Sequence, residues 1–94
     1  MKLQAVVAEI LGTFFFLSII LVAVAESYGP IAIAAGLLAA IYFGGKISGG
    51  HFNPAVSIMM YVKGNINLVT TFAYIVSQII GGLLALLMNS FLIL

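Results

Sequence analysis

The sequence has very little charge and no cysteine, and these two absences exclude most functions of soluble proteins. Its 94 residues include three lysines, two glutamates and one histidine, so charged side chains make up 5% of the chain, against roughly 25% in an ordinary soluble domain. Three lysines cannot supply the many phosphate contacts of nucleic-acid binding, so we expect no nucleic-acid partner. Without cysteine there is no disulfide or thiolate chemistry, and a single histidine forms no metal cluster. We therefore expect no metal, no cofactor and no catalysis.

Hydrophobic residues make up most of the chain, at 65%. A helix that rises about 1.5 Å per residue needs roughly 20 residues to cross the ~30 Å hydrocarbon core of a membrane. A chain of 94 residues therefore has room for at most about four crossings and for no soluble domain. The composition predicts an all-α, multi-pass integral membrane protein whose outer surface contacts lipid.

Three apolar runs predict membrane-spanning helices at about residues 5–25, 30–45 and 66–90, the last within the run Leu68–Leu94. Gly29 and Pro30 follow the charged Glu26 and predict a short exposed turn between the first two helices. Small residues recur at every fourth position in the second and third helices, a spacing that lets helix backbones approach closely. These are Ala32, Gly36, Ala40 and Gly44, and then Ala73, Ser77, Gly81 and Ala85.

Residues 46–62 predict neither a span nor an ordinary loop. Glycines make the first part able to approach other backbone closely, after which Asn53 is a good N-cap and Pro54 a good first helical residue. A helix from Pro54 to Tyr61 would measure roughly 12 Å and reach about half way across the core. The segment is predicted to be a re-entrant loop with a half-helix. Irregular backbone is tolerated at membrane depth only inside protein or beside a wet cavity, so a pore or binding cavity is implied.

The chemistry of this segment favours a neutral polar solute. A half-helix that starts at Asn53 near the midplane directs the positive end of its dipole and an amide donor into the cavity, which repels cations. The preceding carbonyls, which we expect to line the approach, would offer hydrogen-bond acceptors. They belong to Gly49, Gly50, His51 and Phe52. Acceptors leading to a central donor suit water or a small polyol.

The same residues resemble a known family. The stretch from Ser48 to Ser57, which contains the Asn53-Pro54-Ala55 box, looks like the first Asn-Pro-Ala box of the aquaporin and aquaglyceroporin (major intrinsic protein) family. Residues 8–14 (AEILGTF) and 77–82 (SQIIGG) resemble the signatures of its first and third helices. The resemblance covers essentially the whole chain and is closest to bacterial members, which suggests the cytoplasmic membrane of a prokaryote. It implies a single repeat, residues 1–94, equivalent to half of the family's two-repeat fold.

The resemblance also implies roles for individual residues. Asn53, Pro54 and Ala55 would form the pore centre, and Glu9 and Gln78 would brace the re-entrant loop. Because a family pore joins two inverted repeats, we expect an antiparallel homodimer in which the Asn53 residues of both chains meet. Four such pores from eight chains would reproduce the family tetramer. A hetero-pair with a separate partner half, or a fragment of a longer chain, would also fit.

Selectivity is expected to depart from that of two-repeat water channels. In those proteins an arginine of the narrow filter follows the second Asn-Pro-Ala box, whereas Val56 stands at the matching position here. Ile33 falls where the family's second helix supplies a filter aromatic. We expect a wider, more apolar constriction of Ile33 and Val56 that admits water and small neutral solutes such as glycerol.

Two other functions remain open on the sequence. A glutamate such as Glu9 in a membrane span has a high free-energy cost without a partner, so it is a candidate functional group. One alternative is therefore a small dual-topology, proton-coupled exporter in which Glu9 carries the proton. A non-conducting membrane structural protein is the other, although it has no need of the Asn-Pro-Ala box. The lysines Lys2, Lys46 and Lys63 all fall on one side of the expected topology and favour a cytoplasmic N-terminus. Three charges are a small bias that leaves dual insertion possible.

Overall fold

The computed structural model describes residues 2–92, and this part of the chain is all-helical, as the sequence predicts. Its four helices are α1 (Leu3–Ala23), α2 (Gly29–Ser48), α3 (Pro54–Lys63) and α4 (Leu68–Leu92). By length and composition, α1, α2 and α4 are able to cross a membrane. The ten residues of α3 give about 15 Å of helix, half of a ~30 Å hydrocarbon core.

Two helix ends lie beyond the residues where the sequence places them. α2 continues to Ser48, so Lys46 and Ile47 are helical rather than part of the loop. Gly44 and Gly45 do not end the helix; it ends at Ser48, and the C-cap residue Gly49 takes the left-handed conformation (φ 94°) that favours glycine. The half-helix likewise extends past Tyr61 to Lys63 and is capped by Gly64, which also has φ 94°. The last two residues of the apolar run Leu68–Leu94 lie outside the described residues.

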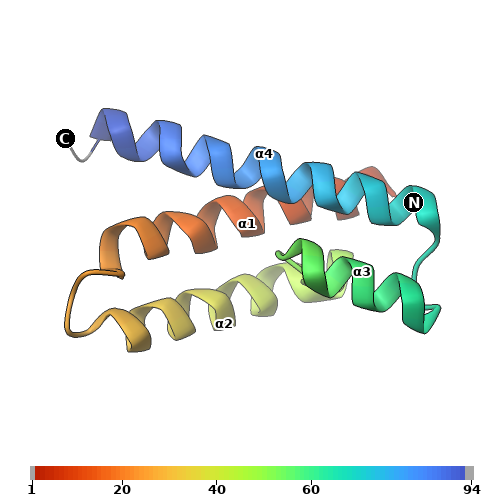
Figure 1. Cartoon of the computed structure of the whole chain (residues 1–94), viewed down its shortest axis with the longest axis horizontal. Helices are drawn as coiled ribbons and strands as arrows, with labels where there is room; N and C mark the ends of the chain where they lie inside the picture. Colours follow the sequence, from red (N-terminus) through yellow and green to blue (C-terminus); the bar gives the residue numbers. More distant parts are fainter. Residues whose placement is uncertain (1, 93–94) are drawn as a thin grey trace.

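α1 packs against both of the other spans, and small residues line the two interfaces (Figure 1). On α2 the buried positions include Gly36, Ala40 and Gly44, and on α4 they include Ser77, Gly81 and Ala85. These are members of the two predicted small-residue stripes. A Cβ atom on Gly81 would lie 2.6 Å from the Ile10 carbonyl oxygen, so only glycine allows this approach of α4 to α1.

α3 packs on α4, and it occupies only one half of the long axis (Figure 1). It begins near the middle of the molecule and ends at the same end as α2 and the start of α1. Lys2, Lys46 and Lys63 therefore lie at one end, while Glu26 lies on the turn at the other. The outer faces of the spans expose large apolar side chains, as a lipid-facing surface requires.

Candidate functional site

The segment between α2 and α3 carries the most unusual backbone in the described chain. Gly49, Gly50 and Phe52 have φ angles of 94°, 65° and 51°. The left-handed region is open to glycine, but for phenylalanine it is strained and needs support from the surrounding structure. The loop therefore keeps this shape only because neighbouring helices hold it.

One support is a slot for the Phe52 ring between α1 and α2. The ring lies against Gly12 and Gly44: a Cβ atom on Gly12 would be 2.1 Å from Phe52 Cε1, and one on Gly44 would be 2.9 Å from Cζ. Phe52 is 3% exposed. Two glycines, one from each span, make room for the ring, which fixes the depth of the loop between the helices.

The second support is Glu9, which is fully buried on α1. Its Oε1 accepts hydrogen bonds from the Phe52 backbone N–H (2.8 Å) and from Gln78 Nε2 (2.9 Å). Its Oε2 accepts from the His51 backbone N–H (3.0 Å) and from Ser48 Oγ (2.7 Å). A buried carboxylate is costly unless its oxygens are bonded, and four donors from α2, the loop and α4 meet that requirement.

A buried polar network extends from Glu9 to the half-helix. Gln78 Nε2 donates to Ser57 Oγ (2.9 Å) as well as to Glu9, which fixes the orientation of the amide because both partners accept from its nitrogen. Ser57, fully buried on α3, also bonds His51 Nδ1 at 2.8 Å. Ser57 thus connects the loop, α3 and α4.

Tyr74 holds the start of the loop from α4. Its hydroxyl donates to the Ser48 carbonyl oxygen at 2.6 Å, and its ring packs edge-on against the His51 ring with a centroid separation of 5.0 Å. Tyr74 is 4% exposed. The last carbonyl of α2 and the side chain of His51 are therefore positioned by the same residue.

The Asn-Pro-Ala box lies at the exposed start of α3. Asn53 caps the helix, since its Oδ1 accepts from the Ala55 N–H at 2.8 Å. Asn53, Pro54 and Ala55 are all exposed. Within residues 2–92, Asn53 Nδ2 donates to no other group. The start of α3 thus presents a free amide donor and the positive end of a helix dipole.

The loop carbonyls are also free. Among the described residues, no hydrogen bond is made to the carbonyl oxygens of Gly49, Gly50, His51 or Phe52. Their N–H groups, in contrast, are used in part: those of His51 and Phe52 bond Glu9, and that of Gly50 bonds Ser48 Oγ at 3.2 Å. The loop is held by its donors and leaves a row of acceptors for other partners.

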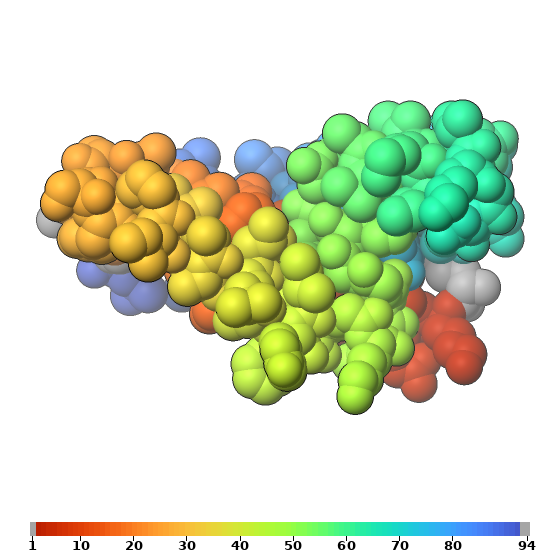
Figure 2. Space-filling model, turned by 90° about the horizontal axis from the view of Figure 1, so that it is seen from below, coloured from red at the N-terminus to blue at the C-terminus, as the bar shows by residue number. Residues whose placement is uncertain are grey.

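Asn53 and Pro54 border a surface hollow of about 560 Å³ between α1 and α4. In Figure 2 the surface is hollowed between the turn that joins α1 to α2, in orange, and the start of α3, in green. Thr13 and Gln78 lie in its walls, and Thr13 Oγ1 and Gln78 Oε1 are buried atoms without a hydrogen-bond partner in the described part of the chain. These two atoms can accept a hydrogen bond from a further polar group beside this hollow.

Ile33 and Val56, the residues expected at the constriction, are not brought together within one chain. Both are half-buried, on α2 and α3 respectively. No residues of α2 and α3 in the described chain approach within 8 Å between Cα atoms.

Three network residues were not identified from the sequence: Ser48, Ser57 and Tyr74. One signal was present for α4, where Thr71, Tyr74 and Gln78 are spaced three and four residues apart and share one helix face. A polar stripe on an apolar span indicates a buried polar interface. Ser48 and Ser57 carry no such signal, because their partners come from α1 and α4 and depend on how the spans pack.

These features define a polytopic membrane protein with a re-entrant half-helix braced by a buried carboxylate, and comparison with known proteins identifies its family. The major intrinsic protein family model matches residues 1–93. The chain is 42% identical to Aquaporin Z of Photorhabdus laumondii over 88% of this chain and 41% of that protein. It is 41% identical to Nodulin-26 of Glycine max, over 88% and 34% of the two chains.

A third relative, the glycerol uptake facilitator protein-like 6 of Lactiplantibacillus plantarum, is 44% identical over 83% of this chain and 38% of that protein. The chain belongs to the major intrinsic protein family. It spans about two fifths of the length of the Photorhabdus protein, and its fold corresponds to half of an aquaporin fold. No solved structure matches the chain significantly.

Proposed function

We propose that this chain forms a passive channel for water and small neutral solutes such as glycerol, with no catalysis and no coupled ion. The observation that carries the proposal is the combination of one free donor at the exposed start of the half-helix, Asn53 Nδ2, with four preceding loop carbonyls that accept no hydrogen bond within residues 2–92. This arrangement offers hydrogen bonds to a polar solute without placing a charged side chain beside it. Membership in a family whose relatives are named as aquaporins and a glycerol facilitator supports the same function.

The half-helix explains how such a channel would oppose cations. The N-terminus of a helix carries about half a positive elementary charge, and α3 directs it toward the exposed Asn53. A cation at this position would lose hydration and meet an unfavourable dipole, whereas water would accept the Asn53 amide hydrogen bond. Exclusion of cations would rest on this dipole and on Asn53, because the chain contains no arginine.

The second half of the pore is proposed to come from another copy of this chain in the opposite orientation. α3 reaches about half way across a ~30 Å core, and the exposed Asn53, Pro54 and Ala55 leave its start uncovered. The unpaired Thr13 Oγ1 and Gln78 Oε1 beside this end support a polar partner there. Four antiparallel pairs would make an eight-chain assembly with four pores.

Ile33 and Val56 would then form the narrowest part from two chains. Both side chains are apolar and smaller than an aromatic ring, and neither carries charge. A constriction of this kind passes glycerol-sized solutes more readily than one lined by arginine and an aromatic ring. The similarity to bacterial relatives supports placement in the cytoplasmic membrane of a prokaryote.

Permeability measurements test the function directly. Proteoliposomes are exposed to osmotic and glycerol gradients in a stopped-flow light-scattering instrument, with Asn53→Asp as the variant and Asn65→Asp, on the α3–α4 turn, as the matched control. We expect rapid water and glycerol flux that needs no pH gradient and resists mercury, since there is no cysteine. Asn53→Asp should slow the flux and Asn65→Asp should not. Permeability equal to that of empty liposomes would overturn the proposal.

Cross-linking tests the pairing of two copies. Because the chain lacks cysteine, Ala55→Cys introduces a single thiol next to the proposed meeting point. A short bifunctional thiol reagent should join two chains through Ala55→Cys, whereas Ser27→Cys, on the α1–α2 turn, should not react in this way. Efficient dimers through Ser27→Cys alone would indicate a different assembly. Conduction by dissociated single chains would also contradict the pairing.

The buried environment of Glu9 supports a bracing role over that of a proton carrier. Its two oxygens already accept four hydrogen bonds, two of them from loop N–H groups. A proton-coupled exporter would need this carboxyl to exchange protons with both sides of the membrane, yet Glu9 has no exposed surface. Export of a cargo driven by a pH gradient, without osmotic swelling, would favour the exporter instead.

A further inference from the structure

The fully buried hydroxyl of Ser57 has two hydrogen-bond partners, Gln78 Nε2 at 2.9 Å and His51 Nδ1 at 2.8 Å. The amide nitrogen can only donate, so Ser57 accepts from Gln78. Among the described residues Ser57 Oγ has no third partner, which leaves His51 Nδ1 as the acceptor of its own hydrogen. A buried hydroxyl hydrogen without an acceptor is destabilising. Ser57 therefore donates to His51.

The direction of this bond fixes where the imidazole ring of His51 carries its proton. A ring nitrogen that accepts from a hydroxyl has no hydrogen of its own, so the neutral ring is protonated at Nε2. The other tautomer and the doubly protonated ring both place a hydrogen on Nδ1, and each would leave the Ser57 hydrogen without an acceptor. Glu9 stands at the start of this series of bonds, because its carboxylate orients the amide of Gln78.

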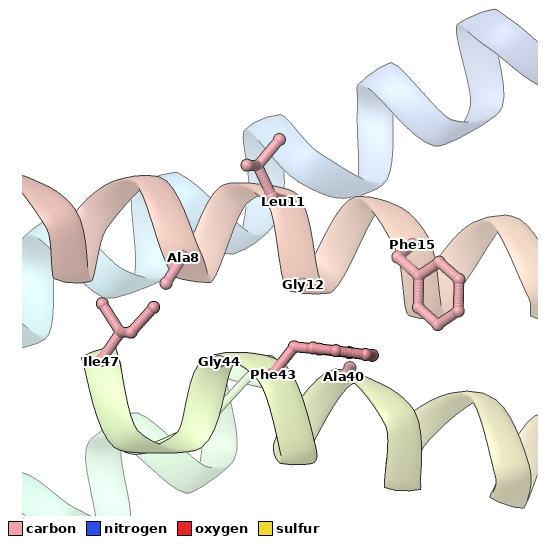
Figure 3. A pocket seen from close by; sticks show the side chains of 8 residues that line it. All are labelled: Ala8, Leu11, Gly12, Phe15, Ala40, Phe43, Gly44 and Ile47. Carbon is pink, nitrogen blue, oxygen red and sulfur yellow. The ribbon is translucent and has the colours of Figure 1, made fainter.

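The backbone that carries the His51 ring is fixed as well. The His51 N–H donates to Glu9 Oε2 at 3.0 Å. The ring of the following residue, Phe52, lies against Gly12 of α1 and Gly44 of α2, on the facing sides of these two helices (Figure 3). The imidazole ring therefore starts from a loop that cannot shift without the loss of these contacts.

The second ring nitrogen, Nε2, reaches the surface of the molecule. It makes no hydrogen bond within residues 2–92, yet the buried side-chain atoms without a partner in that range are Thr13 Oγ1 and Gln78 Oε1 alone. The small exposed part of His51, 8%, therefore includes Nε2. A Cβ atom on Gly49, which is itself exposed, would lie 3.3 Å from Nε2. The Nε2–H group thus opens beside Gly49.

This donor stands at one end of the row of free loop carbonyls. In chain order the row begins at Gly49 and ends at Phe52, and Asn53, whose Nδ2 is also free, follows it. A donor therefore flanks the acceptors at each end, and neither donor carries a charge. Hydroxyl groups both donate and accept, so a solute that carries several of them can bond to both kinds of group.

We propose that Ser57 is a positioning residue that holds His51 in the neutral tautomer with its proton on Nε2, and that this N–H is a second fixed donor for the solute. This role rests on the proposed channel function and specifies the solutes that the loop favours, which are neutral molecules with more than one hydroxyl group. Small polyols such as glycerol meet this description.

Magnetic resonance of the chain with isotope-labelled histidine nitrogens tests the tautomer, because His51 is the one histidine of the sequence. In lipid bilayers near neutral pH, we expect a bare Nδ1, a protonated Nε2 and magnetisation transfer from water to Nε2. Ser57→Ala removes the donor and should populate the tautomer with its proton on Nδ1, whereas Ser57→Thr keeps a hydroxyl and should restore the original spectrum. Ser77→Ala is the matched control, since Ser77 Oγ bonds the Ala73 carbonyl of its own helix.

The spectrum of the unmodified chain is decisive even where a variant fails to fold, which circular dichroism detects. A hydrogen on Nδ1 in that spectrum would overturn the proposal. So would an Nε2 that receives no magnetisation from water, as burial against a second copy of the chain would cause.

Permeability measurements test whether the Nε2–H donor acts on the solute. In Ser57→Ala the ratio of glycerol flux to water flux should fall roughly twofold to tenfold, the effect of one neutral hydrogen bond, and Ser57→Thr should restore it. Glycerol is affected more than water because its hydroxyl groups are fixed along one carbon chain and cannot rearrange independently.

Two results would separate this role from the channel function itself. A conducting chain whose flux ratio is unchanged in Ser57→Ala, or falls equally in Ser77→Ala, would overturn the role of His51 alone. An unmodified chain as impermeable as empty liposomes would overturn the channel and, with it, the action of His51 on a solute.

Discussion

Glu9 connects more of the molecule than any other side chain described above. Its oxygens accept from α2, from the loop and from α4, over sequence separations of 39 to 69 residues. All four donors are buried, and the N–H groups of His51 and Phe52 would be left without an acceptor if the carboxylate were lost. The residue is therefore a structural requirement for the loop, whatever solute passes.

Glu9→Gln is expected to destabilise the fold and to abolish conduction. The amide has one acceptor oxygen in place of two, and its NH₂ group faces donors, so we expect a loss of about 2–4 kcal/mol in the free energy of unfolding. Detergent denaturation followed by circular dichroism measures this loss. Glu26→Gln, the exposed counterpart, should change the free energy by less than about 0.5 kcal/mol. Equal stability of the two variants would contradict the role given to Glu9.

The close packing of the Phe52 ring against Gly12 leads to a second prediction for single residues. Gly12→Ala places a methyl group 2.1 Å from the Phe52 ring, so the ring must move, at a cost of about 1–3 kcal/mol. Gly45→Ala is the matched control, since its Cβ meets Ile41 at an ordinary 3.6 Å, and alanine stabilises a helix by up to about 1 kcal/mol. Unfolding free energies should therefore change in opposite directions. A similar loss in both variants would show that the slot is not tightly packed.

At the scale of elements, α1 is the central helix, and two neighbouring glycines at its interface with α4 differ in how they would tolerate an added methyl group. At Gly81 the nearest atom to an added Cβ is a backbone oxygen of Ile10, at 2.6 Å, which cannot move without separating α1 from α4. At the next residue, Gly82, the nearest atom is Leu17 Cδ2 at 2.9 Å, the end of a flexible side chain. Adjacent glycines thus differ in whether the neighbouring group can yield.

Gly81→Ala is accordingly expected to cost about 1–3 kcal/mol, and Gly82→Ala less than about 1 kcal/mol. Both variants add the same methyl group and gain the same helix propensity, so their difference isolates the close approach of α4 to α1. Detergent denaturation of the two variants side by side measures it. If Gly82→Ala lowers the free energy of unfolding more than Gly81→Ala does, the close approach of α4 to α1 does not lie at Gly81.

Much of the arrangement of helices along the chain could be predicted from the sequence. Apolar runs and the break at residues 26–30 predict the three spans, and Asn53 with Pro54 predicts where α3 begins. The sequence places the end of α2 too early because Gly44 and Gly45 look like helix breakers, whereas both lie within the helix and Gly44 makes room for the Phe52 ring. The left-handed Phe52 and the partners of Ser57 depend on contacts between helices far apart in sequence, which no local pattern contains.

At the scale of the whole molecule, the arrangement of charge bears on assembly. The three lysines lie at one end and the exposed Glu26 at the other, a small bias toward one orientation. An antiparallel pore needs both orientations in the same membrane. The sequence cannot decide this point, because the energetic preference of three charges is small compared with that of inserting three spans.

Orientation-locked variants test that requirement. One variant adds Gln4→Lys and Asn65→Lys, which strengthens the existing bias; the other combines Glu26→Lys and Ser27→Lys with Lys2→Gln and Lys63→Gln, which reverses it. Each alone should give little osmotic swelling, and coexpression of the two should restore it. Protease accessibility of the termini reports orientation. Full conduction by either variant alone would exclude antiparallel pairing.

The partners of the loop also set an order of events during synthesis. The loop leaves the ribosome well before Gln78, which donates to both Glu9 and Ser57. Until α4 enters the membrane, the carboxylate of Glu9 lacks one donor, and the hydroxyl of Ser57 lacks one of its two partners. Tyr74, which holds the Ser48 carbonyl, arrives at the same stage. The span that follows the loop, α4, is thus the one that locks the re-entrant segment, and a nascent chain arrested before α4 would carry the Asn-Pro-Ala box without its final shape.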